Sequence, residues 1–447
     1  MTLSPALPDS RSSIRRWLAM VPMLLGILIG ALAISSASTA LPAIRAELAL
    51  GDTEALWLVD SYSLAMAATL IIAARVGDAF GRKRIILIGL AGFAILNLAG
   101  GLATGGAMLI GARTLLGIAE AFVIAGVVAT IGARYAGRDR VVAYGLWTAT
   151  FGVGNALGPV LGGALAEGPG WRWLFLGAVP LALVAIVLAA WLVPDSRSSR
   201  RPSWDVPSIL ASMLALGGLV LALHEAVAAP LVAVVAGAVA VASLVFFVLR
   251  QRRLREPLID VRLFGLAGFS PAITRILVSA GTSSAAVLLV SLQLQDARGA
   301  SAAEAGLALL PQAAAIAAGG VVTPFLLRWL SANTLTVLAL LVQAAGLGWL
   351  ASDPAFVAAP LVLVGLGFGI AGTLAATALF EATTADQAGQ VGAIQEIGFA
   401  LGAGLGIAVF GTIAAAPAPG GFATAVLAAA VVVGAVAVLP ELRRRRR

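Results

Sequence analysis

Apolar stretches of membrane-spanning length follow one another along almost the whole chain, separated by short segments rich in charged residues, Gly or Pro. A helix needs about 20 predominantly apolar residues to cross a bilayer, and such windows recur about fourteen times. A backbone in lipid must satisfy its own hydrogen bonds, so these windows predict α-helices rather than open strands. Their approximate centres are Leu28, Met66, Leu96, Gly117, Gly154, Val184, Leu216, Val239, Gly281, Ala315, Leu341, Gly369, Gly402 and Val432. The pattern predicts an all-α integral membrane protein.

Two segments within this pattern are typical of connectors. Residues 195–204 are rich in Ser, Arg and Pro, and residues 250–264 combine a run of Arg with Pro and Asp. They bracket two predicted helices and leave six on each side. We therefore expect a six-helix bundle over residues 1–194, two inserted helices with basic linkers over residues 195–262, and a second six-helix bundle over residues 263–447.

Glycine spacing points to an internal repeat. The fifth and the thirteenth predicted helices each carry three glycines at every fourth position, Gly154, Gly158 and Gly162 in one and Gly398, Gly402 and Gly406 in the other. Small residues at this spacing share one helix face and let another helix approach closely. Their matching place, fifth in each half, predicts two parallel repeats. The alternative is that glycine-rich helices are common in membranes, which explains either helix taken alone.

Composition and charge agree with a membrane protein and exclude several other classes. Hydrophobic residues make up 60% of the chain and charged residues 11%, against about 25% charged in a typical soluble domain. Most clusters of basic residues fall in every second loop, and by the positive-inside rule this predicts that both termini lie in the cytoplasm. With no Cys, a single His and no Gly-rich phosphate loop, we expect no disulfide, no metal site and no cofactor. The bias toward Arg, Ala and Gly suggests a bacterial protein, and hence a bacterial plasma membrane.

One predicted turn is unusually rich in charge. Residues 75–86 hold the only Lys of the chain, three Arg and one Asp between two apolar spans. The turn resembles the loop between helices two and three of major facilitator transporters, whose pattern is Gly-x-Leu-Ala-Asp-Arg-x-Gly-Arg-Lys. The matching residues are Asp78, Gly81, Arg82 and Lys83, whereas Ala74 and Ala79 depart from the pattern. The resemblance implies a conformational latch, in which Asp78 faces the start of the thirteenth helix near residues 386–391.

Further motifs extend this resemblance over nearly the whole chain. They are Trp57 to Ser63, Gly111 to Gly117, Gly158 to Gly163, Trp171 to Phe175 and Gly389 to Gly411. In this order they resemble the fourteen-helix drug:proton antiporter family of the major facilitator superfamily, the QacA/SmvA-like pumps for quaternary ammonium and other lipophilic cations. One departure bears on the cation preference or the proton stoichiometry, because Ala33 stands where this family usually has an Asp in helix one.

The resemblance assigns an antiporter motif to the fifth helix. Its residues are Gly154, Gly158, Pro159, Gly162 and Gly163. Pro159 removes one helix hydrogen bond and creates a point that can bend, next to glycines that allow close packing. The alternative is an ordinary proline kink of a transmembrane helix.

Ionisable residues inside the predicted spans are candidate functional sites, since each costs at least about 2.5 to 3.5 kcal/mol on insertion scales. They are Asp60, Arg113, Glu120, Arg275 and Glu396. In this superfamily the helices that carry Asp60 and Glu396 border each other, so we predict these two as the proton-coupling carboxyl groups. An apolar cleft favours the protonated acid and a cationic substrate favours the ionised one, so competition for one site suffices for antiport. The alternative is a structural hydrogen bond from a protonated acid.

Arg113 and Glu120 are seven residues apart and share one face of a helix. By the resemblance both belong to the proton-coupling machinery. The alternative for Arg113 is that it donates hydrogen bonds to backbone carbonyls and braces the bundle. For Glu120 it is a structural hydrogen bond.

Aromatic residues are candidates for the substrate cavity. Tyr144, Trp147 and Phe151 form one stripe on the fifth helix, and Trp57 opens the Trp57 to Ser63 motif. Such a stripe can hold a planar or ammonium ligand by stacking and cation–π contact. The alternative is packing between helices, which is the commoner role of an aromatic stripe.

These features predict a proton-coupled secondary transporter that exports amphipathic, cationic drugs or antiseptics by alternating access. One alternative is an exporter of a single neutral or zwitterionic metabolite or antibiotic, and another is a membrane scaffold or receptor that transports nothing. We expect no enzyme activity and no cofactor, with the proton gradient as the energy source. The expected partners are a small-molecule substrate, protons and the lipid bilayer, without nucleic acid, and the expected functional unit is a monomer.

Overall fold

The computed structural model describes residues 10–197, 204–225, 229–297, 299–300, 302–352, 357–415 and 420–445. These residues form helices joined by short loops, and this part of the chain contains no β-strand. Thirteen of the helices are long and apolar enough to cross a membrane, and Val206–Ala222 forms a shorter apolar helix. The prediction of an all-α membrane protein with about fourteen crossings is confirmed.

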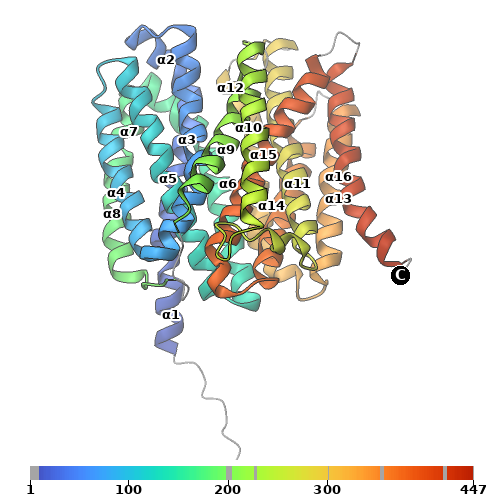
Figure 1. The fold of residues 1–447 in the computed structure, drawn as a ribbon. Coiled ribbons are helices and arrows are strands. Elements are labelled where there is room, and N and C mark those ends of the chain that lie inside the picture. Colours follow the sequence, from blue (N-terminus) through green and yellow to red (C-terminus); the bar gives the residue numbers. More distant parts are fainter. Residues whose placement is uncertain are drawn as a thin grey trace, which may run out of the picture.

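The first half of the chain forms six crossings that follow a short amphipathic helix. Its helices are α1 Ser10–Leu18, α2 Met20–Leu48, α3 Asp52–Phe80, α4 Arg82–Gly101, α5 Gly106–Arg134, α6 Gly137–Glu167, α7 Arg172–Leu176 and α8 Ala178–Leu192. The short α7 and the following α8 together make the sixth crossing, Arg172–Leu192. Figure 1 shows these helices, coloured blue to green, on one side of the bundle.

The remaining helices form an inserted pair and a second set of six. They are α9 Val206–His224, α10 Pro230–Gln251, η1 Val261–Gly265, α11 Phe269–Leu292, η2 Gln293–Ala297, α12 Ala302–Leu326, α13 Ala332–Ser352, α14 Ala358–Glu381, η3 Ala385–Gln387, α15 Ala388–Ala415 and α16 Gly421–Arg445. The second set, coloured yellow to red, lies opposite the first in Figure 1. Figure 1 also places α1 and the end of α16 at the same end of the bundle, as an even number of crossings requires.

The two sets of six helices use the same pairings. The first helix of each set packs against the fifth, in α2 with α6 and in α11 with α15, and the second packs against the fourth, in α3 with α5 and in α12 with α14. The third helix packs against the fourth and sixth in both sets. Two parallel repeats produce this arrangement. The exact domain bounds 1–194, 195–262 and 263–447 stay a prediction.

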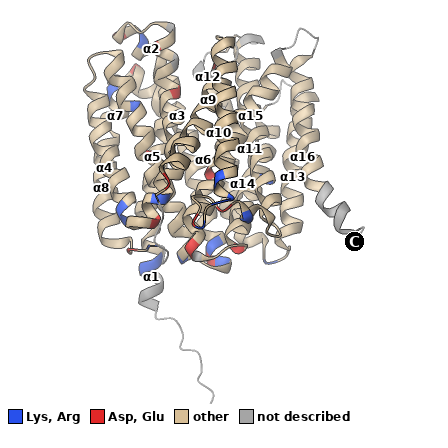
Figure 2. Ribbon diagram, viewed as in Figure 1, with Lys and Arg blue, Asp and Glu red and all other residues tan. Residues whose placement is uncertain are grey.

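Charge is concentrated at one end of the bundle. Arg16, Lys83 and Arg134 lie around one cavity where α1 meets the ends of α4, α5 and α8. We call this the basic end, and in Figure 2 most of the blue Lys and Arg segments lie at the end of the bundle from which α1 extends. The middle of the bundle is mostly uncharged in the same view. This is the asymmetry that the positive-inside rule describes. The cytoplasmic location of the basic end stays a prediction.

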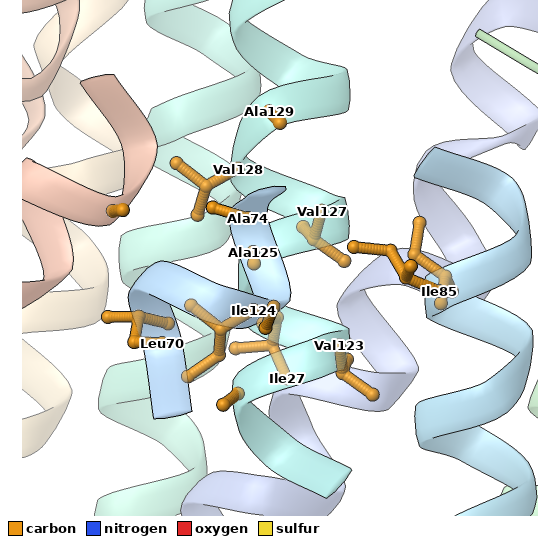
Figure 3. Packing of buried hydrophobic residues seen from close by; sticks show 14 of the residues in the cluster. Ile27, Leu70, Ala74, Ile85, Val123, Ile124, Ala125, Val127, Val128 and Ala129 are labelled. Carbon is orange, nitrogen blue, oxygen red and sulfur yellow. The ribbon is translucent and has the colours of Figure 1, made fainter. Parts of the chain in front are cut away.

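The core of the first half is built around α5, whose side chains are the most deeply buried of the predicted spans. Figure 3 shows these side chains reaching Leu70 and Ala74 of α3, Ile27 of α2 and Ile85 of α4. Lipid tails are as apolar as these residues, so the packing is stabilised by van der Waals contact rather than by exclusion of water. The polar residues of α5 are thereby held at fixed positions inside the bundle.

The inserted helices α9 and α10 pack on each other and lie over the seam between the halves, since α9 contacts both α3 and α15. At the basic end Arg250 donates two hydrogen bonds to the Asp205 carboxylate, at 2.7 and 2.6 Å. Gln251 Oε1 accepts the backbone N–H of Leu258 at 2.6 Å. The linker then reaches the second half, where Gln390 Oε1 accepts the N–H of Asp260 at 3.1 Å.

Candidate functional site between the halves

Two charged residues of α5 lie almost completely buried near the centre of the first half. Arg113 is 1% exposed and Glu120 is 2% exposed. Gly117 lies between them on the same face, and a Cβ there would overlap the backbone carbonyl of Tyr62 on α3. This close approach brings Tyr62 between the two charges, with the Arg113 guanidinium 4.7 Å from the centre of its ring. The structure therefore brings Arg113 and Glu120 into one cluster with Tyr62.

Arg113 ties three helices together through backbone oxygens. It donates to Ala33 O of α2 at 2.7 Å, to Leu58 O of α3 at 3.1 Å and to Val59 O at 3.3 Å. Asp60 lies near enough for its charge to act on the guanidinium. These contacts are the bracing contacts that were the alternative to a proton relay, so the role of Arg113 in proton coupling stays a prediction.

The Glu120 carboxyl group points toward the interface with α2 and the second half. It occupies the space that a Cβ on Gly30 of α2 would fill. Its Oε2 is buried and has no hydrogen-bond partner within the described part of the chain. The charge of Glu396 on α15 acts on this carboxyl group. A buried acid without a partner and with a second acid nearby is suited to holding a proton.

Glu396 lies on α15, where this helix faces α3 and α9. Gln395 Nε2 donates to Glu396 Oε1 at 3.1 Å. The acid borders a small pocket of about 20 Å³, which has room for roughly one water molecule. The other walls of the pocket are apolar and come from three elements: Met66, Ala67 and Leu70 of α3, Ile124 of α5 and Leu216 and Val220 of α9, with Ile397, Ala400 and Leu401 of α15 itself.

Asp60 and Glu396 lie on neighbouring helices but at different levels, and their role in proton coupling stays a prediction. The helices α3 and α15 do border each other, but Glu396 faces Met66 to Leu70, which begin about 9 Å further along α3 at 1.5 Å per residue. Asp60 lies instead beside Arg113. Glu120 is instead the acid on which the charge of Glu396 acts.

Aromatic side chains from both halves meet in the same region. Trp147 of α6 is stacked on Phe151, with ring centres 6.0 Å apart, and lies 5.9 Å from Phe399 of α15. The Trp147 Nε1–H is buried without a hydrogen-bond acceptor among the described residues. Tyr144 lies apart from this group, because its hydroxyl donates to Val128 O at 3.2 Å and its ring stacks on Phe380. The partly buried Trp57 lies near the other end of the bundle, at the start of α3.

The halves are closed against each other between this region and the basic end. Thr373 Oγ1 of α14 donates to Thr148 Oγ1 of α6 at 3.2 Å, and Tyr144 stacks on Phe380 at 5.4 Å. A Cβ on Gly132 of α5 would overlap the Phe380 ring. The basic end is therefore sealed by direct contact between α5, α6 and α14.

The predicted latch residues also lie in this seal. Asp78 is 5% exposed, accepts a hydrogen bond from Arg82 at 3.3 Å, and has its carboxylate against Gly389, in the first turn of α15. A helix N-terminus favours an anion through its free N–H groups and its dipole. Gly81 allows the turn, with φ of 112°, and Lys83 donates to Ala190 O of α8 at 2.6 Å. The structure thus places Asp78 at the start of α15, as the resemblance implies.

The glycines of the antiporter motif form the seam between α6 and α2. A Cβ on Gly154 would overlap Ala31, one on Gly158 would overlap Ser35, and one on Gly162 would come within 2.7 Å of Ser36 O. Pro159 lies between these contacts inside α6, and Gly163 has only Thr39 nearby, at 3.9 Å. The motif is therefore a packing face within the first half.

Three participants in the site were missed from the sequence. Tyr62 joins Arg113 to Glu120, Gly30 makes room for Glu120, and Phe399 meets Trp147. Gly30 follows Gly26 at the spacing of small residues in helix packing, and this signal was available. The other two depend on which helices become neighbours. In the described part of the chain no group of three or more His, Cys, Asp or Glu residues is placed to hold a metal ion.

Two parallel repeats of six membrane helices, with buried acids where they meet, define a secondary transporter. The sequence matches the family model of the Major Facilitator Superfamily over residues 23–407. The chain belongs to this superfamily, whose members are transporters and not enzymes. It is a multi-pass membrane protein.

The similar curated proteins are bacterial export and resistance proteins. The chain is 32% identical over 414 residues to the multidrug efflux pump LfrA of Mycolicibacterium smegmatis, which covers 90% of this chain and 82% of LfrA. It is 30% identical to the methyl viologen resistance protein SmvA of Salmonella typhimurium, over 89% of this chain and 82% of SmvA. It is 29% identical to a tetracenomycin C resistance and export protein of Streptomyces glaucescens, over 90% of this chain and 76% of that protein.

Solved structures support the fold. The human organic anion transporter MFSD10 matches with a TM-score of 0.70 at 14% identity, over 97% of this chain and 99% of MFSD10. The proton:xylose symporter XylE matches with a TM-score of 0.69 at 14% identity, over 96% of this chain and 95% of XylE.

Proposed function

We propose that this protein exports amphipathic, cationic compounds across a bacterial plasma membrane in exchange for protons, by alternating access. The observation that carries the proposal is that Glu120 and Glu396 lie close enough for their charges to interact, while Trp147 packs on Phe399, three residues after Glu396 on α15. Relatives named for multidrug efflux and for methyl viologen resistance support the substrate class. The proton gradient supplies the energy, and no cofactor is required.

The coupling follows from the chemistry of the two acids. Two carboxyl groups whose charges repel in an apolar setting are best accommodated when they share at least one proton. A cation that stacks on Trp147 and approaches Glu396 stabilises the ionised acid and displaces that proton. Export and proton uptake then compete for the same carboxyl groups, which makes the exchange obligatory.

Alternating access requires the basic end to open and close during the transport cycle. Opening it requires Asp78 to leave the N-terminus of α15 and Phe380 to leave Tyr144. The helix that starts at this contact carries Glu396 two turns further on. A movement of α15 therefore links the state of the seal to the position of the acid.

The test is proton release in inverted membrane vesicles that hold an imposed pH gradient. In Glu396→Gln we expect the release that follows addition of a lipophilic cation to fall at least about 100-fold, because the amide cannot exchange a proton. Glu120→Gln should show a smaller loss. The matched control is Glu167→Gln, an exposed acid at the end of α6, which should behave like the unchanged protein. Intact coupling in a well-inserted Glu396→Gln protein would show that the site lies elsewhere.

One observation favours a second candidate, an exporter of a neutral or zwitterionic compound. Ala33, at the position of the family's usual acid, supplies no carboxyl group, and its carbonyl accepts a hydrogen bond from Arg113, so α2 offers a cation no counter-charge at this position. The same vesicles decide between the two functions. Proton release by uncharged compounds and not by cations would favour the second candidate.

A further inference from the structure

A cavity of about 390 Å³ opens at the basic end of the first half, where α1 and α2 meet α4, α5 and α8. Its walls hold four cationic side chains and no acidic one, Arg15, Arg16, Lys83 and Arg134. We propose that this cavity binds the phosphate headgroup of an anionic phospholipid. Basic pockets between transmembrane helices at a membrane surface are suited to such headgroups.

The positive charge of the cavity is only partly compensated. Asp139 forms an ion pair with Arg16, but Arg16 Nε is buried and has no hydrogen-bond partner in the described chain. Lys83 Nζ gives one hydrogen bond, to Ala190 O, and an ammonium group has three donors. Donors from Lys83 and Arg134 therefore remain for a ligand with several acceptor oxygens, and a phosphodiester supplies them.

The rest of the cavity wall is apolar, which favours a lipid over a free phosphate ion. Ala19, between α1 and α2, Met23 of α2 and Leu192 of α8 line it beside the cationic groups. Trp191, also in the wall, is 76% exposed, and Trp at this depth is typical of the boundary between lipid and water. A ligand with a charged head and an acyl chain matches both surfaces.

Arg16 of α1 is held in place by its neighbours. Tyr135, in the turn after α5, donates its hydroxyl proton to Arg16 O at 2.7 Å, and its ring lies 5.2 Å from that of Trp17. Burial raises the pKa of Tyr135 to about 12, so the hydroxyl keeps its proton under physiological conditions. The Arg16 guanidinium lies over both rings. A site fixed in this way loses little freedom when a headgroup binds.

The experiment measures lipid binding to the purified full chain by native mass spectrometry in detergent. The probes are phosphatidylglycerol, phosphatidylcholine with the same acyl chains, and inorganic phosphate as a competitor. The double variant Lys83→Gln with Arg134→Gln is compared with Arg84→Gln with Arg138→Gln, two exposed basic residues outside the cavity. Both variants lose the same net charge.

We expect phosphatidylglycerol to bind the unchanged chain more tightly than phosphatidylcholine. The Lys83 and Arg134 pair should weaken it about 30-fold, from about 1 kcal/mol for each basic residue near an anionic lipid. The control pair should weaken it little. Equal losses in both variants would mean that basic charge acts over the whole surface, and equal affinity for the two lipids would exclude an anionic headgroup. Displacement by inorganic phosphate at matched concentration would identify a free anion site. Each of these results overturns the proposal.

Discussion

The fifth helix of each half packs on the first helix of the same half through glycines, yet the two seams differ in what the glycines meet. In the first half the two tightest contacts, at Gly158 and Gly154 of α6, are with the side chains of Ser35 and Ala31, and only Gly162 meets backbone first, at Ser36 O. In the second half Gly402 and Gly406 of α15 face backbone atoms of α11, and the partner of Gly406 is itself Gly281. A side chain can be trimmed or rotated, whereas two backbones in contact cannot adjust.

This difference suits α15 to a rigid role and α6 to an adaptable one. The helix α15 begins at the Asp78 contact and carries Glu396, so a rigid seam with α11 keeps the gate and the acid at a constant separation. The helix α6 carries Trp147 and contains Pro159, which removes one helix hydrogen bond, so we expect its seam to be the one that adapts. In the proposed function the second half would supply the rigidly held acid Glu396, and the first half an aromatic surface around Trp147 that can adapt.

The largest effect is expected from Gly406→Ala. The new Cβ would overlap the Gly281 carbonyl, and no side chain there can be removed to relieve it. Overpacking of this kind costs roughly 1 to 3 kcal/mol or more, so we expect most of the folded transporter to be lost. The measurement is the monodisperse fraction in size-exclusion chromatography.

Gly411→Ala is the matched control on the same helix. Its Cβ would meet only Leu288, at an ordinary contact distance of 3.6 Å. If the Gly406→Ala protein is as monodisperse and thermally stable as this control, the seam between α11 and α15 is not rigid. The two seams would then not differ in rigidity.

A smaller and reversible effect is expected from Gly158→Ala. The new Cβ would collide with Ser35, and Ser35→Gly removes the colliding atoms. We expect the single variant to lose thermal stability and the double variant to regain most of it, as measured by the melting temperature in detergent. Gly163→Ala, whose Cβ lies 3.9 Å from Thr39, is the control. Failure of the double variant to recover would place both seams in the same rigid class.

The sequence alone predicts those features of the fold that come from patterns repeated along the chain. It does not predict features that depend on how two helices are placed relative to each other. The apolar windows and the glycine spacing are repeated along the chain, so the crossings and the pairing of helices within each half were predictable. The position of Asp78 was also predictable, because a family motif carries it. The level of Asp60 relative to Glu396 was not predictable, because it depends on the relative positions of α3 and α15 along their axes. Asp60 is six residues, or about 9 Å, from Met66, which lines the pocket beside Glu396.

The next largest effect is expected on the opening of the basic end, where Asp78 contacts the start of α15. Asp78→Asn keeps the size of the side chain but removes the charge at the N-terminus of α15, a contact worth about 0.3 to 1 kcal/mol and up to about 2 when partly buried. We expect up to about a tenfold shift toward states that are open at the basic end. Because the chain has no Cys, spin labels can be placed at Arg138 and Glu381, and their distance distribution measured.

Two control variants are measured in the same way. Glu167→Gln, at the opposite end of α6, should leave the distance distribution unchanged. In Gly411→Ala the distribution should also stay as it is, because that substitution leaves both the seam and the latch intact. If Asp78→Asn changes nothing either, the charged turn serves only to orient the chain in the membrane.

The smallest effect is expected in the inserted pair of helices, which belongs to neither seam. Two hydrogen bonds from Arg250 lower the pKa of Asp205 from its ordinary 3.8 to about 2. The folded state therefore gains stability from this carboxylate above about pH 4 and loses that gain as the pH falls toward 2. We expect Asp205→Asn to lower the melting temperature at pH 7 by only about 1 to 2 °C, because exposed pairs contribute little. This difference from the unchanged protein should disappear near pH 2.

Asp195→Asn is the control, since its pair with Arg197 is about half exposed, and it should show a smaller difference in melting temperature at pH 7. A difference that persists at pH 2 would mean that Asp205 acts through its shape at the start of α9 and not through its charge.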